Sequence, residues 1–227
     1  MSIDLKNAIM LWTGGKDSSL ALHEAISSGY QIKCLVTFIP KNPQFLAHPL
    51  EFLKYQADSL NLPHHSLEIN EPYKGSYVKA INSMKKQYEI STLITGDIAE
   101  VNGHPNWIKE CCKTSGVEVF TPLWGLDRHE IINKLISYHF KIIFSCVKKP
   151  WFTEEWIGTE LNNHSLEQLI KLNAETGLDI CGENGEYHTL VLDGPLFKKN
   201  IQIESFSKCT VDSLMYIDIK KVFLDDK

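Results

Sequence analysis

The stretch that decides the fold is Leu11-Trp12-Thr13-Gly14-Gly15-Lys16-Asp17-Ser18-Ser19. It follows an apolar run at residues 8–12 and precedes a helical pattern that ends at Gly29. Two adjacent glycines let the backbone approach an anion closely, and the start of a helix offers unpaired N–H groups and the positive end of its dipole. The lysine and the hydroxyl side chains add further donors. The stretch therefore predicts a loop that binds phosphate or pyrophosphate.

Outward from this loop, short apolar runs alternate with helical patterns. We expect strands at residues 8–12, 32–37, 64–69, 91–95, 117–120 and 141–147, with helices at 18–29, 49–60, 73–88, 106–115 and 127–139. Such alternation indicates a parallel α/β sheet with helices on both faces. The pattern then changes to two helices, at 153–161 and 165–176, and mostly strands. We therefore expect two domains, residues 1–147 and a smaller α+β lobe at residues 148–227.

Composition excludes several classes of protein. The 227 residues are 43% hydrophobic and 22% charged, as in an average globular protein, and the net charge of −5 makes a nucleic-acid partner unexpected. None of the six cysteines forms a C-x-x-C pair, which disfavours a zinc ribbon or an iron–sulfur site. No apolar run approaches the roughly 20 residues that span a bilayer, and the N-terminus lacks an apolar signal core. We expect a cytoplasmic protein without membrane association.

The loop resembles a known family of nucleotide enzymes. Thr13-Gly14-Gly15-Lys16-Asp17-Ser18 is similar to the S-G-G-x-D-S pyrophosphate loop (PP-loop) of N-type ATP pyrophosphatases, with Thr in place of the first Ser. The Walker and dinucleotide motifs do not match. The resemblance implies a Rossmann-like (HUP-type) five-stranded parallel sheet. It also implies that the loop, including Ser19, holds the β,γ-pyrophosphate of ATP with Mg²⁺ nearby. The alternative is a glycine turn without a ligand.

Further motifs are similar to the diphthine–ammonia ligase family. They are residues 34–40, Thr95-Gly96-Asp97-Ile98, residues 120–125 and residues 181–195. That family uses ATP and ammonium to convert the carboxylate of a modified histidine on elongation factor 2 into an amide. Asn184 and His188 depart from the usual Gly and Glu, a form that we associate with bacterial relatives. The acceptor substrate of this branch remains open.

The nucleotide side of the reaction has candidate residues at the ends of strands. Adenylation requires cations and dipoles that neutralise charge on the phosphates, a role suited to Lys16. Asp17 and Asp97 could hold magnesium through water, although Asp17 could instead cap a helix. The resemblance adds Gly96 to the nucleotide site. Backbone groups at Thr37-Phe38 could read the adenine edge, although Phe38 could equally be core.

The C-terminal motif supplies the candidates on the acceptor side. Glu183, Glu186 and His188 lie in a glycine-containing turn that enters a strand, and alternation puts Glu186 and His188 on one face. Two carboxylates and an imidazole suit binding an ammonium or small amine and removing its proton. The alternative is a solvated hairpin tip. Cys181 is either a nucleophile or a small apolar residue, and we favour the latter. The predicted catalytic set is Lys16, Asp97, Glu183, Glu186 and His188.

The sequence thus favours an ATP-dependent amide ligase that forms AMP and pyrophosphate. Its carboxylate acceptor would be diphthine on elongation factor 2 if the source makes it, and family analogy suggests a homodimer. The alternatives are tRNA thiolation, amidation of a small metabolite, and a non-catalytic ATP sensor. Thiolation usually needs paired or persulfide cysteines and a basic RNA-binding face. The sequence has no C-x-x-C pair, and its net charge is negative.

Overall fold

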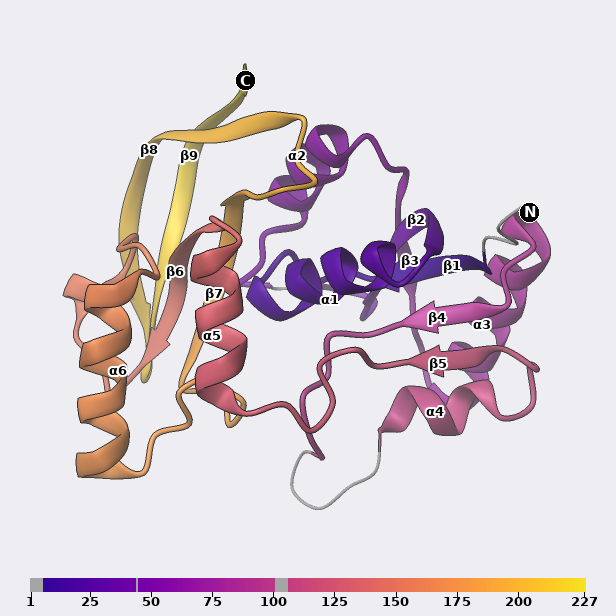
Figure 1. Cartoon of the computed structure of the whole chain (residues 1–227), viewed down its shortest axis with the longest axis horizontal. Coiled ribbons are helices and arrows are strands. Elements are labelled where there is room, and N and C mark those ends of the chain that lie inside the picture. The colour runs from indigo at the N-terminus through magenta and orange to yellow at the C-terminus, as the bar shows by residue number, and fades with distance from the viewer. Residues whose placement is uncertain (1–5, 44, 101–105) are drawn as a thin grey trace. The chain divides into compact units, whose positions relative to one another are not determined.

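The computed structural model describes residues 6–43, 45–100 and 106–227 of the chain, which is drawn in Figure 1. The chain divides into two compact units. The first unit comprises Met1–Thr13, Asp17–Pro43 and Leu62–Gly125. The second comprises Gly14–Lys16, Gln44–Asn61 and Leu126–Lys227. The glycine loop therefore contributes residues to both units.

The first unit holds a parallel sheet whose strand order is β3-β2-β1-β4-β5. Its strands are β1 (Lys6–Leu11), β2 (Tyr30–Ile39), β3 (His64–Glu68), β4 (Thr92–Ile94) and β5 (Glu118–Phe120). This arrangement confirms the expected five-stranded Rossmann-like fold. The order reverses on the two sides of β1, which is where ligands bind on open α/β sheets. The glycine loop follows β1 directly.

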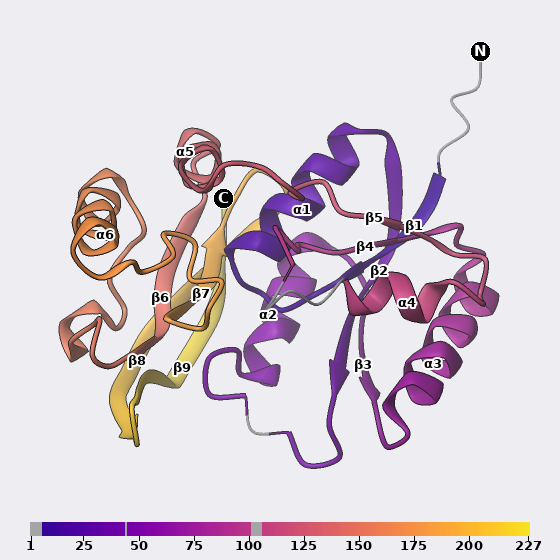
Figure 2. The same ribbon diagram turned by 90° about the horizontal axis from the view of Figure 1, so that it is seen from below.

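Helices cover both faces of this sheet, as the alternation predicted. They are α1 (Lys16–Ser27), α3 (Tyr73–Tyr88) and α4 (Trp107–Cys112). Figure 2 shows α1 on the face of the sheet opposite to α3 and α4. Ile9 and Val36 point into a buried cluster with Ile81 of α3 and Cys111 of α4. Helix α1 begins at Lys16, two residues before the start that we expected.

The second unit is built around an antiparallel sheet in the order β7-β6-β9-β8. Its strands are β6 (Lys141–Lys148), β7 (Tyr187–Asp193), β8 (Lys199–Val211) and β9 (Leu214–Asp226). Its helices are α2 (Leu50–Leu60), α5 (Arg128–Ser137), α6 (Asn163–Thr176) and the 3₁₀ turn η1 (Glu154–Trp156). No helix in the described ranges is long and apolar enough to cross a membrane.

The division between the units differs from the expected boundary after residue 147. Strand β6 pairs antiparallel with β7 and β9, so it belongs to the second sheet, and the first unit already ends at Gly125. The run at 141–147 is apolar throughout, and such a run does not reveal whether its partners are parallel or antiparallel. Helix α2 also groups with the second unit, although its sequence lies between two strands of the first sheet.

Several local predictions also need correction. The helix expected at residues 153–161 is only the short η1 turn. Helix α6 begins at Asn163, two residues before the expected start, and Asn162 and Ser165 form a capping box at its N-terminus. The last two strands expected in this lobe form one long hairpin, because β8 continues to Val211 and the chain turns at Asp212, which has φ of 52°.

Candidate functional site

The glycine loop has a conformation that only glycine fits at residue 14. Gly14 has φ of 75°, a value that favours glycine, and a Cβ there would lie 2.5 Å from Leu53 Cδ2. At Gly15, a Cβ would lie 3.2 Å from the carbonyl oxygen of Thr189 and 3.3 Å from Cε1 of His48. The two glycines therefore let the loop pack directly against α2, β7 and the segment before α2.

Hydrogen bonds within the second unit hold this loop in place. The backbone N–H of Lys16 donates to Thr189 Oγ1 at 3.0 Å, and the N–H of Val191 donates to the carbonyl oxygen of Gly14 at 3.1 Å. Gln56, which is fully buried, donates from Nε2 to the carbonyl oxygens of Gly14 at 2.9 Å and Val191 at 2.7 Å. The loop motif and the C-terminal motif, widely separated in sequence, thus meet through backbone contacts.

Lys16 lies at the N-terminus of α1 and is only 3% exposed. Its Nζ lies 5.5 Å from the centre of the Tyr187 ring, where the ring face attracts a cation. A buried cation beside a helix N-terminus creates a strongly anion-attracting environment. The position of Lys16 therefore supports the predicted contact with a phosphate group.

Two histidines lie beside the loop, and sequence reasoning singled out only one of them. The rings of His48 and His188 meet edge to face, with their centres 5.4 Å apart. Burial, together with the nearby His188 and Lys16, lowers the pKa of His48 to about 3, so this ring is neutral at ordinary pH. Its Nδ1 is screened from solvent and has no hydrogen-bond partner within the described part of the chain. His188 is exposed.

The remaining loop residues belong to the first unit. Thr13 donates from Oγ1 to Ser18 Oγ at 3.2 Å. Thr in place of the first Ser of the PP-loop motif therefore keeps a hydroxyl that forms hydrogen bonds. Ser18 and Ser19 are buried in the first turn of α1, whereas Asp17 is half-buried. Among the described residues, Ser19 Oγ has no hydrogen-bond partner. The hydroxyls and amides of this turn match the donors expected of an anion site.

Gly96 packs tightly against the start of α1 within the same unit. A Cβ at Gly96 would lie 2.7 Å from the carbonyl carbon of Asp17 and 2.8 Å from the nitrogen of Ser18. Asp97 follows and is exposed; its Oδ2 accepts hydrogen bonds from Thr95 Oγ1 at 2.7 Å and from Asn106 Nδ2. Asp17 and Asp97 therefore come from adjoining segments.

The carboxylates at Asp17 and Asp97 do not form a complete metal cage. Within the described ranges, no group of three or more His, Cys, Asp or Glu side chains is arranged to hold a metal ion.

The two residues predicted at the adenine edge occupy different settings. Thr37 Oγ1 donates to the carbonyl oxygen of Trp12 at 2.6 Å and lies 2.8 Å from His64 Nε2. This hydroxyl of β2 therefore contacts both the residue that follows β1 and the first residue of β3. The ring of Phe38 packs edge to face on Tyr77, with centres 4.8 Å apart, beside the buried cluster. The Phe38 side chain is thus partly buried against the core, and the predicted adenine contact of its backbone stays a prediction.

Glu186 has a setting that differs from our expectation. It is 2% exposed, and its carboxylate accepts from the backbone N–H groups of Asp179 and Asn184, both at 2.9 Å. The expectation that Glu186 and His188 share one face is wrong, because Glu186 precedes β7 and is buried against the loop before it, whereas His188 is exposed. Glu183 is half-buried in the same loop.

Two family models divide the chain between them. The model described as "Diphthamide synthase N-terminal domain" matches residues 6–119, and the "Diphthamide synthase C-terminal domain" matches residues 127–224. The chain belongs to the diphthamide synthase family. Residues 120–126 lie between the two matches and include Gly125, where the last segment of the first unit ends.

Curated relatives of this diphthamide synthase family member carry the name diphthine–ammonia ligase. The proteins of Mus musculus and Homo sapiens are each 26% identical to it over 248 residues, covering 96% of this chain and 92% of theirs. The protein of Schizosaccharomyces pombe is 26% identical over 84% of this chain but only 35% of its own length. A solved structure titled as a predicted subunit of tRNA methyltransferase from Methanocaldococcus jannaschii superposes with a TM-score of 0.47 at 16% identity, covering 83% of this chain and 97% of that one.

Five cysteines of this diphthamide synthase family member are buried. Burial raises the pKa of Cys34 to about 12 and the pKa values of Cys112 and Cys146 to about 11, which keeps these thiols protonated. Cys181 is 1% exposed, and its Sγ lies 3.5 Å from the carbonyl oxygen of Arg128. The buried position of Cys181 favours our reading of it as a small packing residue.

Sequence reasoning missed several residues that shape the site. His48, Gln56 and Thr189 contact the glycine loop, and Arg128 donates from Nε to Asp179 Oδ2 at 3.1 Å. Thr189 lay within the quoted C-terminal motif and could have been selected there. His48 and Gln56 carried no signal, because their partners are long-range backbone atoms that only the fold brings together.

Proposed function

We propose that this protein is an ATP-dependent ligase that forms an amide from a carboxylate and ammonia, releasing AMP and pyrophosphate. The observation that carries the proposal is the bond from the N–H of Lys16 to Thr189, which joins the glycine loop to the C-terminal motif of the family. Membership of the diphthamide synthase family supports the same chemistry. The relatives named diphthine–ammonia ligase point to diphthine as the acceptor.

The phosphate end of ATP would occupy the loop and the first turn of α1. The N–H groups of this turn, the hydroxyls of Thr13 and Ser18, and the buried Lys16 ammonium are the donors that a β,γ-pyrophosphate requires. As pyrophosphate leaves, the charge that builds on it is balanced by Lys16. We further propose that Asp17 and Asp97 hold Mg²⁺ through water, which would supply additional positive charge at the phosphates.

The chemistry then runs in two steps. A carboxylate oxygen of the acceptor attacks the α-phosphorus, the bond to the β-phosphate bridge breaks, and pyrophosphate departs. Ammonia next attacks the acyl carbon, the carbon–oxygen bond to AMP breaks, and the nitrogen loses a proton. The exposed His188 and the half-buried Glu183 are the groups that we assign to receiving that proton and binding the amine. Glu186 supports them by holding the turn.

The partners follow from the same assignment. We propose that the acceptor carboxylate belongs to diphthine on elongation factor 2, that the protein works in the cytoplasm, and that it forms a homodimer as family analogy suggests. Its reduced cysteines are compatible with a reducing compartment.

The test is product analysis with α-labelled ATP, magnesium, ammonium and diphthine-bearing elongation factor 2. We expect AMP and pyrophosphate that depend on the acceptor, and an amide on the acceptor by mass spectrometry. Lys16→Ala should abolish turnover, whereas Lys86→Ala, an exposed change on α3, should retain it. Formation of ADP and phosphate only, or ATP binding without turnover, would refute the assignment.

A further inference from the structure

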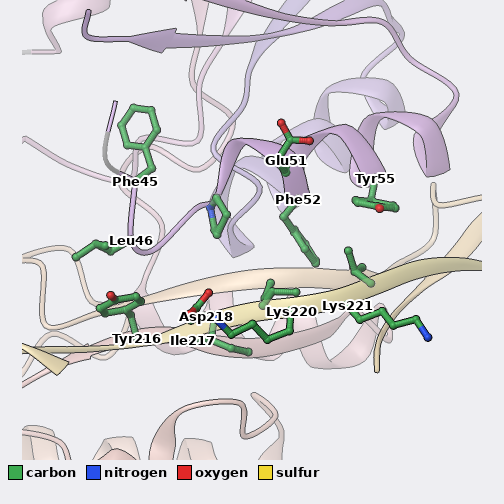
Figure 3. A pocket seen from close by; sticks show the side chains of 13 residues that line it. Phe45, Leu46, Glu51, Phe52, Tyr55, Tyr216, Ile217, Asp218, Lys220 and Lys221 are labelled. Atoms are coloured by element: carbon green, nitrogen blue, oxygen red, sulfur yellow. Dashed lines mark hydrogen bonds and ion pairs between the residues drawn. The ribbon is translucent and has the colours of Figure 1, made fainter. Parts of the chain in front are cut away.

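A groove of about 690 Å³ lies between α2 and β9, entirely within the second unit. Figure 3 shows α2 above β9, with aromatic side chains from the α2 side reaching toward the strand. That wall includes Phe45, Phe52 and Tyr55, and the opposite wall is formed by the seven consecutive residues 216–222. No residue of the glycine loop lines this groove.

The consecutive lining residues show that β9 presents its backbone edge to the groove. Successive side chains of a strand point to opposite faces, so a groove over one face would be lined by every second residue. Here the groove is lined both by residues whose side chains point to one face of β9 and by residues whose side chains point to the other. Alternate residues direct their N–H and C=O groups to one edge of a strand, and the six residues 217–222 span about 20 Å at about 3.3 Å per residue.

The pairing of the sheet leaves this edge open. Strand β8 pairs with β9 from one end to the other, with two register shifts beside Ser205, but on its other side β9 pairs with β6 only at Leu214, Met215 and Tyr216. Farther along, β6 bonds to a different segment: Phe144 N–H donates to the oxygen of Thr159 at 3.0 Å. Within the described ranges, no strand pairs with the second edge of β9 from residue 217 to 222.

The hairpin register shows which backbone groups face the groove. Leu214 closes the two-residue turn opposite Val211, so its N–H and C=O point toward β8, and alternation gives Asp218 the same orientation. The N–H and C=O groups of Ile217 and Ile219 therefore point away from β8. Ser213 is oriented in the same way, and its carbonyl oxygen accepts from the N–H of Lys149 at 2.9 Å. Ile219 therefore directs its N–H and C=O toward this edge, along which no strand is paired in the described part of the chain.

Charge in the groove is already matched. Glu51 pairs with Lys54 at 2.7 Å, Lys221 pairs with Glu204 at 2.7 Å, and Asp218 pairs with Lys220. A groove with neutralised charges, aromatic walls and an open strand edge suits an uncharged extended polypeptide and disfavours a phosphate-bearing ligand.

We propose that this groove binds an extended, uncharged segment of the acceptor protein as an additional strand on the free edge of β9. This inference rests on the proposed function, in which the reacting carboxylate belongs to a protein. Helix α2 connects the groove with the glycine loop, because Tyr55 lines the groove and the adjacent Gln56 donates a hydrogen bond to Gly14 of the loop. A docked segment would therefore be anchored on the same helix that fixes the phosphate-binding loop.

Two pairs of variants test the groove in steady-state assays with diphthine-bearing elongation factor 2. Ile219→Pro removes the edge N–H, and Ile219→Val keeps it. Tyr55→Lys places a charge in the groove, and Asp58→Lys places one on an exposed site of α2 outside it. We expect Ile219→Pro and Tyr55→Lys to raise the KM for the acceptor protein about tenfold. The KM for ATP and kcat should remain unchanged in all four variants.

Hydrogen exchange of the wild-type protein provides a second measurement that does not depend on the proline variant folding. The amides of Ile217 and Ile219 should gain protection when elongation factor 2 is added. Unchanged exchange at these amides, or an unchanged acceptor KM in Tyr55→Lys, would overturn the groove assignment. A wild-type dimer that Ile219→Pro converts to a monomer would assign the edge to a second copy instead and would also overturn it. Absence of AMP from the wild type would refute the proposed function itself.

Discussion

Gln56 donates from its side-chain amide to the carbonyl oxygen of Gly14 at 2.9 Å, and the same nitrogen donates to Val191 at 2.7 Å. One fully buried amide thus ties α2 to the glycine loop and to β7. Buried carbonyl oxygens carry a large cost when they lose their donors. The conformation of the loop therefore depends on a residue that lies 42 positions away in the sequence.

Replacing Gln56 tests this dependence. Gln56→Leu has a similar volume but leaves two carbonyl oxygens without this donor, so we expect a loss of about 2–4 kcal/mol in the free energy of unfolding. ATP affinity should also fall, because the carbonyl oxygen of Gly14 then keeps only the bond from the N–H of Val191. Urea denaturation and calorimetric titration with ATP measure the two effects. Gln87→Leu, an exposed change on α3, is the control, and equal behaviour of the two variants would contradict the role of Gln56.

The close contact at Gly96 makes a second prediction. Gly96→Ala would push a methyl group to within 2.7 Å of the Asp17 backbone, so the start of α1 must move. We expect a loss of about 1–3 kcal/mol in stability and a weaker affinity for ATP. The control is Gly75→Ala in α3, where the nearest heavy atom would lie 3.9 Å away, and where alanine should stabilise the helix by up to about 1 kcal/mol. Thermal unfolding that ranks the two variants in the opposite order would count against this account.

The low pKa of His48 predicts sensitivity to acid. An unfolded histidine takes up a proton near pH 6.5, whereas folded His48 does so only near pH 3. Between these values the unfolded state binds more protons, so stability falls as the pH falls, by up to about 1.4 kcal/mol per pH unit. His48→Asn removes the titrating ring and should flatten that slope.

The measurement for His48 is urea denaturation at several pH values between 7 and 4. The difference in unfolding free energy between wild type and His48→Asn should shift in favour of the variant as the pH is lowered. His164→Asn, an exposed change in α6, should follow the wild-type profile. Parallel profiles for wild type and His48→Asn would show that His48 does not remain neutral in the folded protein.

The two glutamates of the C-terminal motif should differ when each is changed to Gln. Glu186→Gln replaces a buried acceptor of two backbone N–H groups, so we expect about 1–3 kcal/mol of lost stability. Glu183→Gln, at a half-buried site, should change stability by less than about 0.5 kcal/mol while lowering turnover. Calorimetry and AMP formation separate the two cases. A stable but inactive Glu186→Gln would restore the catalytic role that the sequence suggested for Glu186.

Much of the nucleotide half could be predicted from local pattern. The glycine pair at residues 14 and 15, the strand before it and the helix after it form a contiguous signal, and the five-stranded parallel sheet follows from regular alternation. The C-terminal motif was predicted less well. Glu186 was assigned to the face of His188 because the start of β7 at Tyr187 could not be located from alternation alone.

The sequence by itself determined the chemistry that is available: a glycine loop with Lys16, carboxylates at strand ends, and a C-terminal motif of two glutamates and a histidine. These signals lie within short windows, where backbone preference and residue type act locally. Only the tertiary structure decided that Thr189, Gln56 and His48 pack on the loop, that β6 joins the second sheet, and that β9 keeps an open edge. These contacts join segments far apart in the chain, and their partners are mostly backbone atoms, which every residue carries and no sequence pattern distinguishes.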